Sequence, residues 1–224
     1  MAPHMPRQPE PEAMDLAAEA EAYAKADFAD VNQAFVERLL ALAGHLPKAA
    51  AVDLGTGPGD IPVRVALARP GWRVLAVDAS AAMLGFARRA AEEAGLAERV
   101  ELVLGDAKAT GLPAAAFDVI FSNSILHHIS EVDRFWGELR RLGRVGAIVL
   151  LRDLARPPSE AAACRIVDRY ASGESALLQE EFYRSLLSSY TVEEVAGQLD
   201  RAGLAMLEAA MVTDRHLDVF GRLP

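Results

Sequence analysis

The chain has 224 residues, 52% of them hydrophobic, and a formal net charge of −9 at pH 7. The hydrophobic content suffices for a packed core, and the acidic balance argues against a nucleic-acid partner. No apolar run approaches the roughly 18 residues of a membrane span. The one cysteine, Cys164, excludes an internal disulfide. We therefore expect a cytoplasmic protein without membrane contact, as a monomer or homodimer.

The N-terminal part divides into two segments. Residues 1–13 are rich in proline and lack apolar periodicity, which predicts a disordered tail. A helical pattern then runs from about Met14 to Ala43, and Phe35 and Leu39 recur on one apolar face in its second half. We expect an N-terminal helical cap over residues 14–46.

A strand, a glycine turn and a helix follow in that order. The apolar run from Ala49 ends at Asp53, and Gly55, Gly57 and Gly59 follow at alternate positions before a helical segment. Glycine permits positive φ and lets the backbone approach a ligand closely. The free N–H groups at the start of the helix attract polar or anionic ligands. This arrangement predicts a loop that binds a nucleotide cofactor.

The glycine spacing discriminates between cofactors. A dinucleotide-binding Gly-x-Gly-x-x-Gly motif would need glycine where Asp60 stands. Asp53 would repel a diphosphate, whereas it would attract the amino group of a zwitterionic ligand. An NAD-dependent oxidoreductase therefore remains only the alternative.

Two further acids end predicted strands. The strand from Trp72 closes on Asp78, about 20 residues past the glycines, where a carboxylate can accept both hydroxyls of a ribose. The other interpretation of Asp78 is an N-cap for a helix that begins near Ser80 and is ended by Gly95. The strand from Val100 is followed by Asp106. Three successive strands thus carry an acid at their carboxyl ends.

The pattern of Asp53, Gly55, Gly57 and Gly59 resembles motif I of the class I S-adenosylmethionine (SAM) dependent methyltransferases, of the type found in ubiquinone and menaquinone biosynthesis. In that family the loop wraps the methionine end of SAM, and the acid after the third strand bonds the adenine amino group. The resemblance implies one domain over residues 14–224, with a Rossmann-like, doubly wound, seven-stranded, mostly parallel sheet and a helical cap. A protein that binds SAM without catalysis is a further alternative. The implied cofactor-binding residues are Tyr23, Asp53, Gly55, Thr56, Gly57, Gly59, Asp78, Ala79, Asp106, Ala107 and Asn123.

The resemblance also implies that segments before the first strand close the substrate pocket. Tyr23, Phe28 and Asn32 are candidates for its lining, with core packing as the other interpretation of the two aromatic residues. The same resemblance implies a place near adenine for Met83, although a core methionine is the favoured interpretation.

Two histidines follow the fourth predicted strand, Phe117–Asn123. His127 and His128 lie in the loop before a helix that Ser130 is expected to cap. Neutral imidazole is a suitable base near pH 7 if the methyl acceptor carries a proton. Both histidines are therefore candidate catalytic residues. Glu131 lies next to them, but no further His or Cys spacing completes a metal site, so no metal is expected.

The same loop bears on the acceptor. Family members that methylate exocyclic or amide nitrogens carry an Asn/Asp-Pro-Pro-aromatic motif at this place, and the run Asn123-Ser124-Ile125-Leu126 has neither proline nor aromatic residue. A small-molecule acceptor is the expectation.

The C-terminal third begins with a strand over residues 146–154, whose Arg152 and Asp153 either touch substrate or form a mutual surface salt bridge, the favoured interpretation. Two helical stretches over residues 155–190 then predict a lid inserted into the sheet. Thr191 begins a capping box. Residues 204–211 and 216–222 are expected to form a strand pair that closes the sheet, with His216 in a structural role.

Overall fold

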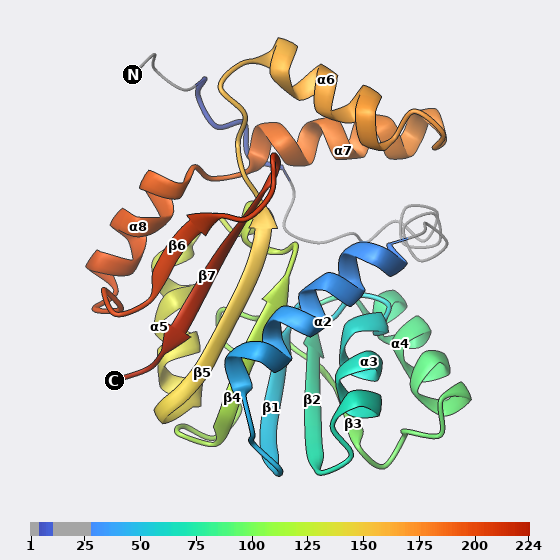
Figure 1. Cartoon of the computed structure of the whole chain (residues 1–224), viewed down its shortest axis with the longest axis vertical. Helices are drawn as coiled ribbons and strands as arrows, with labels where there is room; N and C mark the ends of the chain where they lie inside the picture. Colours follow the sequence, from blue (N-terminus) through green and yellow to red (C-terminus); the bar gives the residue numbers. More distant parts are fainter. Residues whose placement is uncertain (1–4, 11–27) are drawn as a thin grey trace.

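A computed structural model describes residues 5–10 and 28–224 of the chain. Its centre is one seven-stranded sheet of order β3-β2-β1-β4-β5-β7-β6 (Figure 1). The first five strands are parallel to one another, and β7 runs antiparallel to both β5 and β6. The predicted doubly wound, mostly parallel sheet is confirmed. The strands are β1 (Ala49–Leu54), β2 (Trp72–Asp78), β3 (Val100–Leu104), β4 (Phe117–Asn123), β5 (Gly143–Leu154), β6 (Glu208–Met211) and β7 (His216–Arg222).

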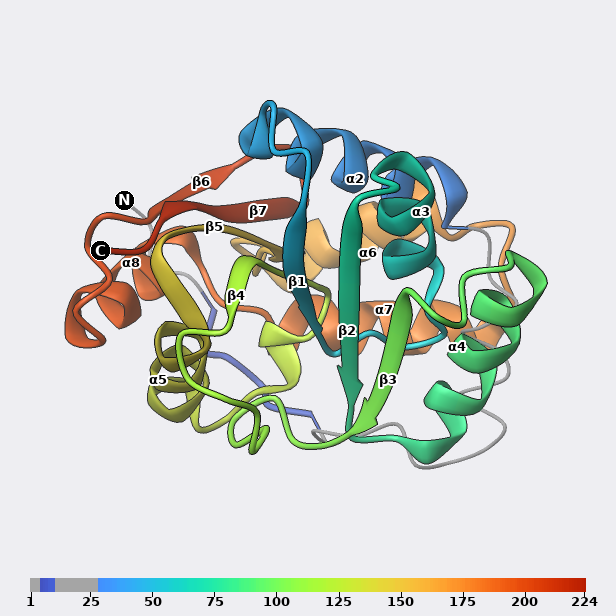
Figure 2. The same ribbon diagram turned by 90° about the horizontal axis from the view of Figure 1, so that it is seen from below.

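Helices cover both faces of the sheet because the central strands are buried on both sides. The helices α2 (Ala29–Ala43), α3 (Asp60–Ala68) and α4 (Ala81–Glu93) contribute to one hydrophobic cluster with the sheet. The helices α5 (Val132–Leu142) and α8 (Val192–Arg201) contribute to the other. Figure 2, seen from below, places these two groups on opposite sides of the strands.

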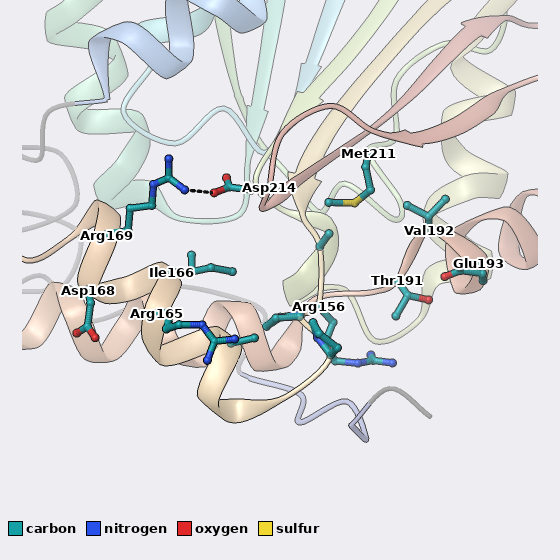
Figure 3. A pocket seen from close by; sticks show the side chains of 14 residues that line it. Arg156, Arg165, Ile166, Asp168, Arg169, Thr191, Val192, Glu193, Met211 and Asp214 are labelled. Atoms are coloured by element: carbon teal, nitrogen blue, oxygen red, sulfur yellow. Dashed lines mark hydrogen bonds and ion pairs between the residues drawn. The ribbon is translucent and has the colours of Figure 1, made fainter. Parts of the chain in front are cut away.

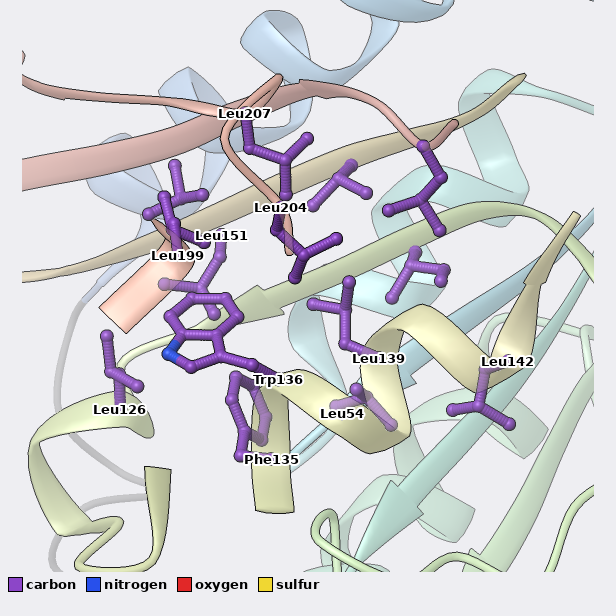
Figure 4. Close-up of a cluster of buried hydrophobic side chains, with 14 of the residues drawn as sticks. Leu54, Leu126, Phe135, Trp136, Leu139, Leu142, Leu151, Leu199, Leu204 and Leu207 are labelled. Carbon is purple, nitrogen blue, oxygen red and sulfur yellow. The ribbon is translucent and has the colours of Figure 1, made fainter. Parts of the chain in front are cut away.

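The second cluster is built around an aromatic pair on α5 (Figure 4). Phe135 and Trp136 are fully buried and pack edge to face, with ring centroids 5.1 Å apart. The indole N–H of Trp136 donates to Gln198 on α8 at 3.0 Å, so its polar atom is satisfied inside the core. This contact fixes α8, and with it the chain that leads into β6, against the sheet.

Three predicted boundaries differ from the structure. Glu131, not Ser130, is the N-cap of α5, because the backbone carbonyl of Glu131 accepts the N–H of Arg134 and Phe135. β5 starts at Gly143, directly after α5, and β6 starts only at Glu208, because a turn between Leu204 and Leu207 precedes it. The N-cap of α4 is Ser80 and not Asp78. The predicted capping box at Thr191 is confirmed, with Glu194 as its second member.

Residues 155–190 form two helices, α6 (Glu160–Tyr170) and α7 (Ala176–Ser188), beyond the carboxyl ends of the strands (Figure 1). They share a small core with Leu154 at the end of β5. No helix within residues 28–224 is long and apolar enough to cross a membrane.

Residues 5–10 correct part of the predicted disordered tail. They lie beside α7 (Figure 1), where Met5 packs on the small core of α6 and α7, and Gln8 donates its N–H to the Leu187 carbonyl at 3.0 Å. Proline-rich sequence gave no periodicity from which this packing could be read. The rest of the expected tail, and the first part of the 14–46 cap, lie outside the described residues.

Candidate functional site

The glycine turn between β1 and α3 combines close packing with one open position. All three glycines have positive φ, from 55° to 86°. A Cβ on Gly59 would meet the backbone of Ala87 at 2.8 Å, and one on Gly55 would overlap the Ile125 side chain. A Cβ on Gly57 would meet nothing within 4 Å. The turn is therefore pressed against α4 and the β4 loop on two sides, and at Gly57 its backbone is open to a ligand.

Asp53 lies buried at the end of β1, with 2% of its surface exposed. The hydroxyl of Thr56, also buried, donates to its Oδ2 at 2.7 Å. Burial raises the pKa of the Asp53 carboxyl to about 7, against the lowering effect of this hydrogen bond, and the charge of Asp78 adds to the rise. The carboxylate therefore lacks a positively charged partner among the described residues.

Asp78 connects the glycine turn to the start of α4. Its Oδ2 accepts the Gly57 N–H at 2.7 Å, and its Oδ1 accepts the Ser80 N–H at 2.8 Å. Burial raises the pKa of Asp78, and these backbone donors oppose the rise. A carboxylate offers about four acceptor positions, so it retains capacity for ligand hydroxyls. Asp78 thus contacts the Gly57 backbone and Asp53 contacts the neighbouring Thr56, so both carboxylates lie at the glycine turn.

For the remaining predicted cofactor residues, the structure shows no hydrogen bond to the glycine turn among the described residues. Asp106 follows β3, is exposed, and pairs with Lys108 at 3.1 Å. Ala79 is exposed and Ala107 half-buried beside their respective acids, and Asn123 ends β4 opposite Arg152 of β5. Tyr23 lies outside the described residues.

The three remaining candidates, two for the substrate pocket and one for the adenine site, differ in their surroundings. Asn32 donates to Asp60 Oδ2 at 2.9 Å, which ties α2 to the first turn of α3 beside the glycine turn. Phe28 is 36% exposed, whereas Met83 is buried in α4. For Met83 the structure supports core packing.

His127 is buried in a short 3₁₀ helix, η1 (Leu126–His128), and is anchored by Asp153 of β5. Its Nδ1 lies 2.5 Å from Asp153 Oδ1, and its backbone N–H donates to Oδ2 at 3.1 Å. Burial lowers the pKa of His127, but the charge and hydrogen bond of Asp153 outweigh burial and raise it overall. The Nδ1–H donates to the carboxylate in the neutral form, which leaves the Nε2 lone pair to accept a proton or bind a cation.

Glu10 brings a third ionisable side chain to the two histidines. Its Oε1 lies 3.5 Å from His127 Nε2 and 3.3 Å from His128 Nδ1. Ser185 on α7 donates to the same oxygen at 3.1 Å. Sequence analysis missed Glu10 because only the fold brings the N-terminal segment to the β4 loop. Glu131, the acid adjacent to the histidines in sequence, pairs instead with Arg134 at 3.1 Å.

A second missed feature lies in the same loop. Ser124 has φ 59°, a left-handed conformation that only a few per cent of non-glycine residues adopt. Its N–H donates to the Arg152 carbonyl at 2.9 Å, which holds the turn between β4 and the histidines.

Arg152 and Asp153 do not pair with each other, contrary to the favoured interpretation. Alternate residues of a strand point to opposite faces, so Asp153 meets His127 while Arg152 binds Asp218 of β7 through two hydrogen bonds of 2.6 and 2.8 Å. His216 is buried and hydrogen-bonded to Thr213, as its predicted structural role requires.

A pocket of about 930 Å³ opens between α6 and the β6–β7 turn (Figure 3). Arg169 of α6 pairs across it with Asp214 at 3.2 Å. None of the described residues predicted for cofactor binding or catalysis lines this pocket.

Known proteins resemble the central part of the chain. Residues 52–151 match the family model described as a methyltransferase domain. A release factor glutamine methyltransferase from Gloeobacter violaceus is 44% identical over 92 residues, which are 41% of this chain and 32% of that protein. A demethylmenaquinone methyltransferase from Thermus thermophilus is 32% identical over 110 residues, which are 49% of either chain. The chain thus spans a third to a half of these two relatives' length.

The fold resembles solved structures over nearly all of the chain. A SAM-dependent methyltransferase from Aquifex aeolicus superposes with a TM-score of 0.69 at 19% identity, covering 93% of this chain and 99% of its own. At this identity the superposition shows the fold alone, and the match to the methyltransferase domain model is confined to residues 52–151. In its sheet order, its glycine turn and its segment 52–151, this chain is thus similar to SAM-dependent methyltransferases.

Proposed function

We propose that the protein transfers a methyl group from SAM to a small-molecule acceptor. The observation that carries this proposal is the pair of carboxylates, Asp53 and Asp78, that bond to the glycine turn at Thr56 and Gly57, where a Cβ on Gly57 would meet nothing within 4 Å. SAM is a zwitterionic nucleoside, so its amino group and its ribose hydroxyls suit two separate carboxylates. When bound, SAM supplies a sulfonium methyl group that a nucleophile displaces in line.

The chain's residues hold the cofactor by complementary charge. The ammonium group of SAM supplies the counter-ion that Asp53 lacks among residues 5–10 and 28–224, and binding therefore returns the raised pKa of Asp53 toward its ordinary range. Asp78 binds the ribose hydroxyls with the acceptor capacity left by its backbone donors Gly57, Ser80 and Ala79. Asp106 is the proposed partner of the adenine amino group, which requires its carboxylate to exchange or share the contact with Lys108.

The acceptor is proposed to bind beside His127 and His128. The Ile125 side chain packs against Gly55 of the glycine turn, and His127 follows Ile125 by two residues. The loop that carries the histidines therefore lies next to the glycine turn. The helices α6 and α7 lie over the same strand ends and form the proposed lid over residues 155–190. The rate of methyl transfer depends mainly on how the acceptor is positioned. Where the acceptor carries a proton, His127 or His128 accepts it.

A small molecule is favoured over a protein side chain as the acceptor. The relative named for glutamine methylation would suggest an amide nitrogen. The loop at Asn123 lacks the proline–proline–aromatic run expected for amide nitrogens, and the relative named for demethylmenaquinone indicates a small molecule. The cytoplasmic location and the monomeric or homodimeric state stay predictions.

Ligand-dependent stabilisation tests the proposal. We expect SAM and S-adenosylhomocysteine at about 100 times Kd to stabilise the chain by about 2.7 kcal/mol, a rise in Tm of roughly 5–10 °C for a domain of this size. NAD at the same concentration should leave Tm unchanged. Stabilisation by NAD alone would favour the oxidoreductase alternative. Methyl transfer to a panel of small molecules can be monitored by mass spectrometry. If the chain binds SAM tightly but methylates none of these molecules, a non-catalytic binding protein is favoured.

A further inference from the structure

We propose that Glu10, His127 and His128 form a binding site for one divalent first-row transition metal ion, with Zn²⁺ as the reference ion. The proposal goes beyond the methyltransferase assignment and refines it at the acceptor site. It reverses the expectation from sequence that no metal is bound, because Glu10 supplies the third ligand that the sequence around the histidines lacks.

Two of the three ligand-atom separations match a tetrahedral site. Zn–N and Zn–O bonds of about 2.0–2.1 Å require ligand atoms about 3.3–3.4 Å apart. Glu10 Oε1 lies 3.3 Å from His128 Nδ1 and 3.5 Å from His127 Nε2. Both separations exceed the usual N–H···O hydrogen-bond range of about 2.7–3.2 Å. All three ligand atoms lie within 4.8 Å of one another.

Hydrogen bonds from neighbouring side chains orient two of the proposed ligands, His127 and Glu10. Metal-binding histidines commonly donate their other ring N–H to a carboxylate, and His127 Nδ1 lies 2.5 Å from Asp153 Oδ1. Asp153 also accepts the backbone N–H of Leu154 at 2.6 Å, so it is fixed as the supporting group. Glu10 is held by Ser185 through its side chain.

Charge balance also favours a cation. The side chains of Glu10 and Asp153 are only 9% and 2% exposed, and buried carboxylates need compensation. Arg7, the nearby cation, instead donates to the backbone carbonyls of His127 and Ser188 at 2.7 and 2.5 Å. One divalent ion would neutralise both carboxylates.

The donor set indicates the class of ion. Mg²⁺ and Ca²⁺ take oxygen ligands, whereas two imidazoles and one carboxylate suit Zn²⁺, Fe²⁺ or Co²⁺. Three protein ligands leave a position for an exogenous ligand. This refinement rests on the proposed function: the acceptor would be a molecule whose nucleophilic hydroxyl, enol or thiol binds the ion, which lowers the pKa of that group so that its proton passes to solvent water. His127 then serves as a ligand and not as the base.

Metal binding to the intact chain tests the site without recourse to activity. After treatment with chelator and dialysis, calorimetry with Zn²⁺ should give one site per chain, and Co²⁺ should give the visible absorption of a four-coordinate ion. Glu10→Gln and His128→Asn should each weaken Zn²⁺ binding at least tenfold. Asp153→Asn should weaken it by about 10- to 100-fold through His127. Glu131→Gln is the matched control and should bind as the wild type does.

Two results would overturn the metal site: a folded wild type that takes up no Zn²⁺, or equal affinity of Glu10→Gln and Glu131→Gln. Circular dichroism melts of each variant distinguish lost ligands from lost fold. Titration of the same preparations with S-adenosylhomocysteine keeps the two proposals separate. Cofactor binding without Zn²⁺ binding would refute the metal site alone, and the reverse would refute the proposed function alone.

Discussion

Replacing Asp53 by asparagine should stabilise the ligand-free protein and weaken cofactor binding at the same time. Burial raises the pKa of this carboxyl from 3.8 to about 7. A carboxyl whose folded pKa is raised favours the folded state most at low pH, and its contribution is lost as the pH rises through the folded pKa. The ionised group therefore destabilises the ligand-free protein near neutrality, and asparagine removes that effect.

The magnitude follows from the shift. Each pKa unit corresponds to about 1.4 kcal/mol, so between pH 5 and pH 8 the wild type should lose about 3 kcal/mol more than Asp53→Asn. The amide can still accept the Thr56 hydroxyl, and any fixed loss from its unpaired NH₂ is the same at both pH values. The difference between the two pH values is therefore the quantity to measure, by urea unfolding.

Cofactor binding should change in the opposite direction. Loss of a charged partner for the ammonium group should weaken SAM binding at pH 8 by about 2 kcal/mol, which is some 30-fold. Asp60→Asn, at a partly exposed acid paired with Arg64, is the control and should change neither quantity by this amount. The reasoning fails if Asp53→Asn loses stability with pH in parallel with the wild type, or if it binds SAM with unchanged affinity.

Three further predictions concern the same turn and the far end of the sheet. Asp78→Asn should weaken S-adenosylhomocysteine binding by about 1–3 kcal/mol, measured by calorimetry; unchanged affinity would remove Asp78 from the site. Gly59→Ala should lower Tm more than Gly57→Ala, since both have positive φ but only the former meets Ala87, whereas Gly57→Ala should impair cofactor binding more; the reverse order would contradict the proposed open position. Burial lowers the pKa of His216 to about 4, so stability should fall by about 3 kcal/mol as the pH drops from 6.5 to 4, and His216→Gln should reduce that fall; an equal fall in both proteins would contradict the assigned burial of the neutral ring.

Much of the fold could be predicted because its signals are local. Short runs of a few residues suffice to predict a strand, a turn or a helix. Examples are the apolar run ending at Asp53, the alternating glycines and the strand ending at Asp78. The family resemblance then implies how these units order themselves in a sheet. The cap of α5 was predicted one residue early, because Ser130 and Glu131 both precede the helix and only tertiary packing decides between them.

The acceptor side of the site could not be predicted to the same extent. His127 and His128 are visible in the sequence, but their partners come from other elements, Asp153 from β5 and Glu10 from the N-terminal segment. No spacing rule links such distant residues. Arg152 shows the same limit, because its partner Asp218 lies on the antiparallel strand β7 and faces it only through the sheet register.

The measurement that tests the central claim most directly is a calorimetric titration of the ligand-free chain with S-adenosylhomocysteine at pH 8. If the Gly57 turn and its two carboxylates form the cofactor site, the titration gives one binding event per chain, weakened in Asp53→Asn and in Asp78→Asn. An intact, folded chain that takes up no S-adenosylhomocysteine, or one whose affinity is the same in both variants, would contradict the assignment of this turn.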